Sequence, residues 1–232
     1  MKQYYFLLLL FPFFSFSQQV VDTSYVDLKY REDQFYLFAT YNALSDGPSN
    51  LKQNGFSTSF QLGFIRDFPI NKARNIAFGV GLGFGYNTLN QNLYVSNSDT
   101  ASLSFKFLAR EDGNYSKNKL KLATVDLPIE FRWRTSTAET FNFWRIYPGI
   151  KFSYLLSSQS KYEGDLGKSS VKDIDNLTKF QYGLTLSTGY SGVNLFVYYG
   201  LTPLFESGTR TVDGIMLDEI ISLQFGLSFY IL

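Results

Sequence analysis

Large apolar side chains alternate with small or polar ones along most of the chain after residue 33. The clearest run lies between Asn75 and Asn87, where large residues occupy every second position and glycine fills most positions between them. A period of two is that of a β-strand, whose successive side chains point to opposite faces. A glycine face suits the crowded interior of a small barrel, because side chains from opposite walls compete there for space. The pattern therefore predicts an all-β protein with a closed sheet.

Eight segments carry this alternation, and each lies in a strand of about 10 residues or more between its connections, which is the length that a tilted strand needs to cross a bilayer. The expected strands lie at residues 35–41, 59–64, 75–87, 123–134, 145–156, 179–186, 193–201 and 221–231. The facing of the first strand stays open, because Tyr36 and Phe38 are as aromatic as their neighbours Phe35 and Leu37.

The connections between these segments alternate strictly between long and short. Long polar connections lie at 44–56, 89–119, 158–177 and 205–218, and short ones at 69–74, 135–141 and 191–192. This alternation is typical of outer-membrane barrels, which have short periplasmic turns and long extracellular loops. We therefore predict an all-β, eight-stranded antiparallel transmembrane β-barrel over residues 34–232, located in the cell outer membrane.

The longest connection contains an alternation of its own at Leu103, Phe105 and Phe107. A ninth membrane strand there would put the C-terminus on the wrong side of the membrane. We therefore expect a hairpin arm that extends above the barrel.

The N-terminus has the pattern of a secretory signal peptide. Lys2 precedes an almost wholly apolar stretch from Tyr4 to Phe16, and small residues at Ser15 and Ser17 stand before Gln18. This stretch is too short to span a membrane, so we expect cleavage after residue 17 rather than a membrane anchor. Residues 18–33 are polar and form a predicted periplasmic N-terminal segment.

Composition narrows the possible functions. The composition includes Phe 24 and Tyr 17 as residue counts, and so many aromatic side chains argue against disorder. The mean hydropathy is nevertheless only -0.09, which argues against helical membrane spans. A net charge of +1 gives no field to attract nucleic acid. Cys 0 and His 0 exclude disulfides, cysteine nucleophiles, histidine-based metal sites and Ser-His-Asp triads. We expect no metal, no cofactor and no enzymatic activity.

Aromatic side chains are expected in a belt at the periplasmic ends of the outward-facing rows. The residues concerned are Phe68, Trp133, Trp144 and Tyr190. Their rings favour the headgroup level of a bilayer.

Charged residues gather on the predicted inner face of one hairpin. They are Asp126, Glu130, Arg132, Arg134, Arg145 and Lys151, with Lys179 expected on the inner face of a later strand. In a narrow lumen they can neutralise one another as a structural network of buried ion pairs. The alternatives are a carboxylate acid/base pair or an ion path, although eight strands leave no open pore.

The last strand ends with a polar residue, a glycine, an aromatic residue and an aliphatic residue at Gln224, Gly226, Phe229 and Ile231. This spacing resembles the signal by which the barrel assembly machinery recognises the final strand of a barrel. We therefore expect the sheet to close with the last residues of the chain.

Several segments together carry a family resemblance. They are the Phe-rich leader ending at Phe16, Ser17 and Gln18, the glycine-alternating run from Phe78 to Tyr86, the segment Val125–Phe131 with Pro128, and the segment Tyr198–Thr202. In these the chain resembles the PorT-like outer-membrane β-barrel proteins of Bacteroidota. The resemblance implies an accessory role in type IX secretion or gliding, and it carries over no catalytic residue.

The leading hypothesis is therefore a non-enzymatic outer-membrane barrel that serves as a structural or accessory component of an envelope protein-secretion complex. Expected partners are outer-membrane lipid and lipopolysaccharide, the barrel assembly machinery during insertion, and other envelope or secretion proteins. One alternative is a membrane-embedded hydrolase of lipid or peptide that uses Asp126 or Glu130 beside Arg132. Another is a small surface adhesin whose 89–119 arm presents an edge strand to a partner.

Overall fold

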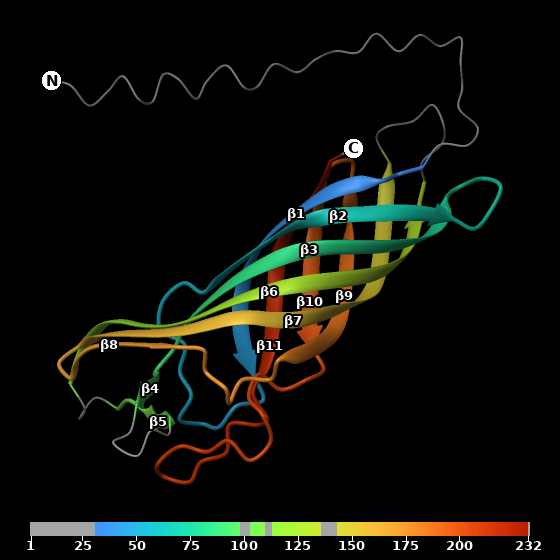
Figure 1. The fold of residues 1–232 in the computed structure, drawn as a ribbon. Helices are drawn as coiled ribbons and strands as arrows, with labels where there is room; N and C mark the ends of the chain where they lie inside the picture. Colours follow the sequence, from blue (N-terminus) through green and yellow to red (C-terminus); the bar gives the residue numbers. More distant parts are fainter. Residues whose placement is uncertain (1–30, 98–102, 110–112, 136–142, 232) are drawn as a thin grey trace, which may run out of the picture.

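The computed structural model describes residues 31–97, 103–109, 113–135 and 143–231 (Figure 1). The predicted signal peptide, most of the predicted N-terminal segment and most of the 135–141 turn lie outside the described residues. No helix among the described residues is long and apolar enough to cross a membrane.

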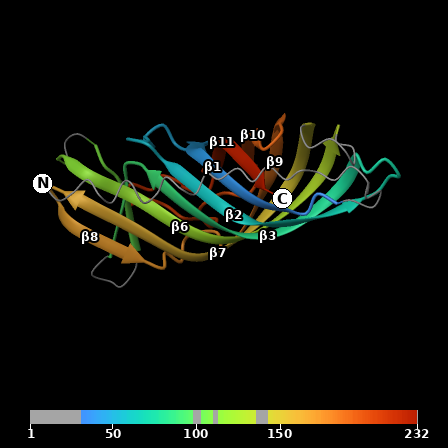
Figure 2. The same ribbon diagram turned by 90° about the horizontal axis from the view of Figure 1, so that it is seen from above.

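Long strands that follow one another in the chain also lie side by side in space. Those that form the barrel are β1 (Gln34–Ser45), β2 (Thr58–Pro69), β3 (Ile76–Asn90), β6 (Tyr115–Arg134), β7 (Trp144–Gly164), β9 (Phe180–Tyr190), β10 (Val193–Gly200) and β11 (Ile221–Ile231). Each pairs antiparallel with the next, and β11 pairs with β1 from Phe35↔Ile231 to Ser45↔Ile221. The described chain is thus a closed, eight-stranded antiparallel barrel, as the sequence predicts (Figures 1 and 2).

Side-chain facing follows the predicted alternation and settles the facing of the first strand. In β1 the side chain of Phe35 is 62% exposed, whereas Tyr36 and Phe38 are 3% and 2% exposed and lie in the lumen. Outward rows of Phe, Leu, Ile, Val and Tyr cover the barrel strands, and polar side chains fill much of the interior. A soluble protein has the opposite arrangement, with apolar side chains inside. Apolar side chains on the outer face of a barrel are favourable where that face contacts lipid.

The glycine face of β3 points inward and gives room to larger side chains from its neighbours. A Cβ atom on Gly83 would lie 2.1 Å from the Tyr36 hydroxyl and 2.4 Å from the Leu62 carbonyl oxygen, and one on Gly79 would lie 2.6 Å from Nε of Arg132. The glycines are therefore what lets aromatic and arginine side chains cross the lumen.

Two strands are longer than the alternation suggested. β6 has 20 residues and β7 has 21, and with β8 (Gly167–Lys172) they extend as a three-stranded sheet beyond the barrel at the end with the long loops. A register shift between Ala123 and Thr124 marks where the outward row changes from apolar to polar. The predicted end of the 89–119 loop and the predicted start of the 158–177 loop were wrong. The strands continue past both positions, because polar residues there still alternate between the two faces.

The hairpin predicted within 89–119 is present as β4 (Leu93–Asn97) paired with β5 (Leu103–Phe107). It lies beyond the barrel at the end with the long loops, but it packs against other loops and is not a free arm (Figure 1). Its apolar side chains Leu93, Val95, Phe105 and Phe107 are buried in a cluster with residues from the other long loops. Burying these apolar side chains in the cluster is more favourable than leaving them exposed to water on a free arm.

The predicted aromatic belt is exposed at the short-turn end of the barrel. Phe68, Trp133, Trp144 and Tyr190 all point outward, and the rings of Trp144 and Tyr190 lie 5.4 Å apart on neighbouring strands. Lys179 departs from the prediction, because it precedes β9 and its exposed side chain lies 3.9 Å from Asp175.

Candidate functional site

The lumen is filled by three layers of side chains, and the long loops cover one end of it. A charged layer lies at the short-turn end, an aromatic layer lies in the middle, and a layer of amides lies below the long loops. Each layer is built by inward positions of several strands, so only the closed barrel assembles it.

The charged layer is centred on Asp67 of β2, which is fully buried. Arg134 donates from Nη1 and Nη2 to the two carboxylate oxygens of Asp67, at 2.8 Å each. Arg132 donates from Nη1 to Oδ1 of the same carboxylate at 3.1 Å. One carboxylate thus partly neutralises two buried guanidinium groups. The pair with Arg134 has the bidentate geometry that makes such ion pairs strong.

Glu130 completes the neutralisation of Arg132. Nε of Arg132 donates to Oε2 of Glu130 at 3.0 Å, and the Tyr230 hydroxyl donates to Oε1 at 3.2 Å. Arg132 also donates to the backbone oxygen of Glu32 at 3.1 Å, which fixes the chain just before β1 to the barrel wall. Both carboxylate oxygens of Glu130 are therefore occupied by structural partners.

The six charged residues singled out in the sequence do not form a single network. Arg132 joins Glu130 directly, and Arg134 is linked to them only through Asp67. Among the described residues, no ion pair connects Asp126, Arg145 or Lys151 to the others.

Those three charged groups have other surroundings. The guanidinium carbon of Arg145 lies 4.5 Å from the centre of the Phe143 ring. Nζ of Lys151 donates to Oε1 of Gln61 at 2.8 Å and lies 4.3 Å from the centre of the Tyr198 ring. Asp126 is buried diagonally across the β6–β7 pair from Lys151, without a hydrogen-bond partner in the described part of the chain.

The aromatic layer closes the middle of the lumen. Phe38 lies between Tyr36 and Phe196, with ring centres 4.7 Å and 4.4 Å away, and Tyr230 contacts both Phe38 and Tyr147 at its ring edges. The centres of neighbouring rings lie 4.4 to 5.9 Å apart, so these rings are in contact and fill the middle of the lumen.

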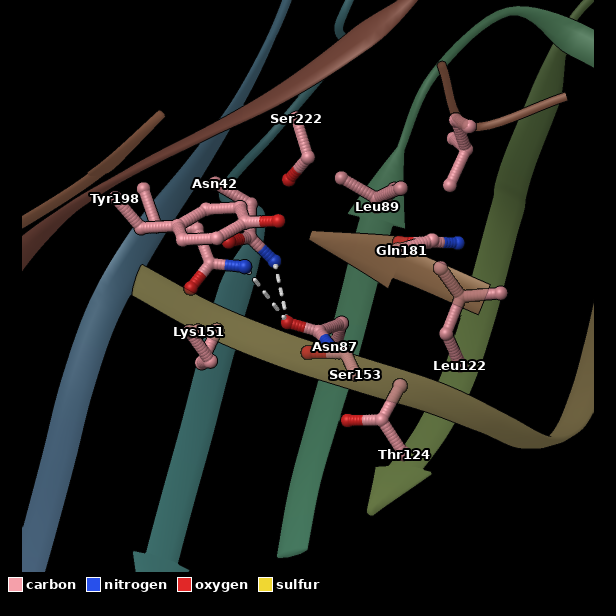
Figure 3. A pocket seen from close by; sticks show the side chains of 12 residues that line it. Asn42, Asn87, Leu89, Leu122, Thr124, Lys151, Ser153, Gln181, Tyr198 and Ser222 are labelled. Atoms are coloured by element: carbon pink, nitrogen blue, oxygen red, sulfur yellow. Dashed lines mark hydrogen bonds between the residues drawn. The ribbon is translucent and has the colours of Figure 1, made fainter. Parts of the chain in front are cut away.

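The amide layer surrounds a small cavity (Figure 3). Nε2 of Gln61 donates to Oε1 of Gln224 at 2.7 Å, and Gln224 and Asn42 both donate to Oδ1 of Asn87. The cavity measures about 20 Å³, which is room for about one water molecule. It is too small for a substrate or a hydrated ion in transit.

Sequence reasoning missed Asp67, the carboxylate on which the charged layer depends. Counting every second residue from Gln61 along β2 reaches Asp67, so the period of two contained the signal. The contributions of Glu32 and Tyr230 could not be found in this way, because they depend on which strands become neighbours when β11 meets β1.

The residues of the expected C-terminal signal lie on both faces of β11. Gln224 and Gly226 point into the lumen, and a Cβ on Gly226 would lie 2.3 Å from the Ala39 carbonyl oxygen. Phe229 and Ile231 face outward, opposite Leu37 and Phe35 of β1. The strand therefore closes the barrel, while its recognition by assembly machinery stays a prediction.

The long loops form a folded unit, which we call the loop body. It comprises β4, β5, β8, the ends of β6 and β7 beyond the barrel, loops 46–57, 173–179 and 201–220, and the short connections 91–92, 108–109 and 165–166. Its apolar core includes Leu93, Phe105, Leu177, Leu217 and Ile220.

Hydrogen bonds join separate loops across this core. Asn92 accepts from the backbone N–H of Lys52 at 2.7 Å and donates to Leu108, and the backbone N–H of Val212 donates to Phe105 of β5 at 2.9 Å. The loop body is consequently a packed lid with a defined surface.

No three His, Cys, Asp or Glu side chains in the described ranges lie close enough together to hold a metal ion. Comparison with curated proteins found no match.

Two solved structures give low-similarity matches. One is Ail, the attachment invasion locus protein of Yersinia pestis, in complex with the heparin analogue sucrose octasulfate: it is 12% identical, with 86% of this chain and 97% of that chain covered, at a TM-score of 0.36. The other is a chain from work on the asymmetric conductivity of engineered proteins. It is 11% identical, with 85% of this chain and 98% of that chain covered, at a TM-score of 0.20.

A family model gives a match that covers most of the chain. The model of the outer membrane protein beta-barrel domain matches residues 16–206, which include every barrel strand except β11. The closed barrel, with apolar rows facing outward and a polar lumen, is the architecture that this description names. The chain therefore belongs to the outer membrane protein beta-barrel domain family.

Proposed function

We propose that the protein is a non-enzymatic, non-conducting outer-membrane anchor whose extracellular loop body binds another envelope protein. The observation that carries this proposal is a lumen filled along its length beneath a loop body with its own apolar core. A filled lumen favours neither transport nor catalysis. An ordered loop surface on a rigid scaffold is the usual place for recognition.

The finer proposal is an accessory role in a type IX secretion or gliding complex. It is supported by the resemblance to PorT-like barrels of Bacteroidota in the segments Phe78–Tyr86 and Val125–Phe131. Apolar side chains exposed on the loop body, at Leu166 and Val212, are candidate contacts for a protein partner.

Affinity purification of the full-length, membrane-inserted chain tests the partner. We expect one envelope protein to be retained by the wild type and lost from a Leu166→Asp/Val212→Asp variant. An Asp213→Asn variant, altered at an exposed position of the same loop, is the matched control and should retain the partner. Recovery of no specific envelope protein would overturn the anchor proposal.

Deletion of the gene tests the secretion role separately. We expect cargo proteins of the secretion system to accumulate inside the cell, and expect re-expression of the wild-type chain to restore their export. Unchanged export in the deletion strain would overturn the secretion role and leave the partner experiment unaffected.

The absence of enzymatic activity is part of the proposal. Both carboxylate oxygens of Glu130 are occupied, and the cavity that Lys151 lines is too small for a lipid or peptide. Asp126→Asn and Glu130→Gln variants that remain folded should show the same lipid composition and peptide turnover as the wild type. Loss of a hydrolytic activity in a folded variant would instead identify a lumen enzyme.

A surface adhesin is the second candidate, because β8 pairs only with β7 among the described strands and so has an edge available for another chain. Deleting the 89–119 segment would open the loop core, so point changes on β8 are a sharper test. The backbone N–H of Asp173 donates to Ser158 of β7, so in this register the N–H of Ser170 points away from β7, and Ser170→Pro would block pairing along this edge. We expect it to abolish cell-surface attachment if this candidate is correct, while the barrel remains folded.

A further inference from the structure

A row of lysines continues the outward-facing side of β6 where its apolar residues end. From Trp133 to Ala123, alternate residues of β6 face outward and are large and apolar or alanine; Lys121, Lys119 and Lys117 follow on the same side. The change from apolar to basic is abrupt.

The height of this change corresponds to the outer edge of the bilayer. Between Trp133 and Ala123 the strand rises about 33 Å along its length, at about 3.3 Å per residue. At a tilt near 40° this is about 25 Å of height, which equals the apolar band of an outer-membrane barrel. With Trp133 in the periplasmic belt, Lys121 and Lys119 lie at the headgroups of the outer leaflet.

The lysines converge on one groove. Lys117, Lys119, Lys121 and Lys161 line a hollow of about 440 Å³ together with Phe56, Thr58, Thr88 and Asn90, and we call it the lysine groove. Lys119 stands directly opposite Lys161 in the β6–β7 pair, and Lys121 stands opposite Thr88 of β3.

Most of this positive charge has no protein counterion. Lys117 pairs with Glu163 at 2.8 Å, but among the described residues no carboxylate pairs with Lys119, Lys121 or Lys161. Like charges directly opposite on neighbouring strands are destabilising. An anion seated between them would remove this cost.

An apolar groove adjoins the lysine groove on the bilayer side. It measures about 590 Å³ and is lined by Tyr41, Phe60, Phe225 and Leu227 among others. Phe56 and Thr58 line both grooves.

Phe56 is 72% exposed, and its ring lies 5.3 Å from that of Tyr41, which lies 5.3 Å from that of Phe225. Nδ2 of Asn90 donates to the Phe56 carbonyl oxygen at 2.5 Å, so the segment between the grooves is held to β3.

We propose that these two grooves form one binding site for a phosphorylated acyl glycolipid of the outer leaflet. Lys119, Lys121 and Lys161 would hold its phosphate groups, and the apolar groove would hold an acyl chain. The lysine ammonium groups supply charge-assisted hydrogen bonds to phosphate oxygens. This site does not depend on the secretion role, and it would orient the loop body on the membrane surface.

Binding is tested with the full-length chain in phosphatidylcholine nanodiscs that contain a small fraction of lipid A. Lipid adducts are counted by native mass spectrometry. We expect bisphosphorylated lipid A to be retained over dephosphorylated lipid A by a factor on the order of ten. This comparison uses the wild-type chain alone, so it does not depend on the folding of a variant.

Charge variants test the residues. Lys119→Gln/Lys121→Gln/Lys161→Gln should lose most of this preference. Lys52→Gln/Lys72→Gln/Lys172→Gln, which removes the same charge from exposed positions elsewhere, should keep it. Phe225→Ala should weaken retention of lipid A but leave the effect of the phosphates unchanged.

Three outcomes would overturn the proposal. Equal retention of the two forms of lipid A would exclude phosphate recognition. Full competition by inorganic phosphate at the same concentration would indicate a site for the free ion. Displacement of the lipid by an acidic polysaccharide, with no effect of Phe225→Ala, would indicate a polymer site.

Discussion

At the scale of single residues, the barrel depends on buried charges that neutralise one another and on glycines that leave them room. Arg132 and Arg134 are fully buried and share Asp67, while Gly79 lies where the Arg132 side chain crosses the lumen. Breaking a buried ion pair leaves an uncompensated charge, which costs more free energy than the intact pair contributes.

Replacing Asp67 by asparagine should therefore be strongly destabilising. We expect the free energy of unfolding to fall by about 3–5 kcal/mol, since Arg134 loses its charged partner and Arg132 is left with Glu130 alone. Urea titration of the lipid-inserted barrel, followed by its gel mobility shift, measures the loss. Asp213→Asn is the control at an exposed position, and a loss of equal size there, or none at Asp67, would contradict the role assigned to Asp67.

Gly83 tests the second residue-scale requirement. Gly83→Ala places a methyl group 2.1 Å from the Tyr36 hydroxyl and 2.4 Å from a backbone oxygen, so the wall must shift. We expect a loss of about 1–3 kcal/mol. In Gly192→Ala the nearest atom to the new methyl group is 4.0 Å away, so this change should have little effect on the same unfolding curve. Equal stability of the two variants would show that the lumen is not tightly filled at β3.

At the scale of elements, β6 and β7 join the barrel to the loop body. The extension carries an exposed ion-pair triad in which Glu163 accepts from Lys117 at 2.8 Å and lies 2.7 Å from Nζ of Lys168 on β8. Because the triad lies beyond the bilayer, Glu163 is in contact with water and can take up a proton. The β7–β8 hairpin is therefore sensitive to pH.

Hydrogen bonds from Lys117 and Lys168 lower the pKa of Glu163 from 4.5 to about 2. Because the folded pKa lies below the ordinary value, the contribution to stability is present above about pH 4.5 and is lost as pH falls toward 2. NMR titration of the Glu163 carboxyl carbon should show a midpoint near 2. In Lys117→Gln/Lys168→Gln the midpoint should return toward 4.5, and a wild-type midpoint already there would exclude the triad.

Periodicity predicted the elements of the barrel well and their ends less well. Alternation in β3 from Ile76 to Asn87 was sufficient to assign facing, because each outward residue there is apolar and each inward residue is small or polar. The continuation of β6 through Lys121 and Lys117 looked like loop, since the outward row becomes polar where the bilayer ends. Likewise, Glu130 and Arg132 share one strand and could be paired from the sequence, whereas Tyr230 reaches Glu130 only through barrel closure.

At the scale of the whole molecule, the protein is a sealed barrel with a packed lid. Charged, aromatic and amide layers fill the lumen, and the cavity among the amides has room for about one water molecule. The two ends of the barrel differ, with an aromatic belt at the short-turn end and the lysine groove at the end with the long loops.

A sealed lumen has an electrical consequence. Insertion of the purified chain into a planar bilayer should give no steady conductance steps at neutral pH, because the aromatic layer and the loop core both block the axis. The informative comparison is Phe38→Ala/Phe196→Ala. This variant removes two rings of the aromatic layer and so opens the middle of the lumen beneath an intact loop core. Stable ohmic steps from the wild-type chain would contradict the sealed lumen.

The central claim, that the loop body binds an envelope protein, is tested most directly by site-specific photocrosslinking in living cells. A photoreactive residue at Val212, in the exposed loop, should give one discrete protein adduct, whereas the same residue at Leu195, on the lipid-facing wall, should give none. Absence of any protein adduct from Val212 and from Leu166, in a chain that is folded in the outer membrane, would contradict the claim.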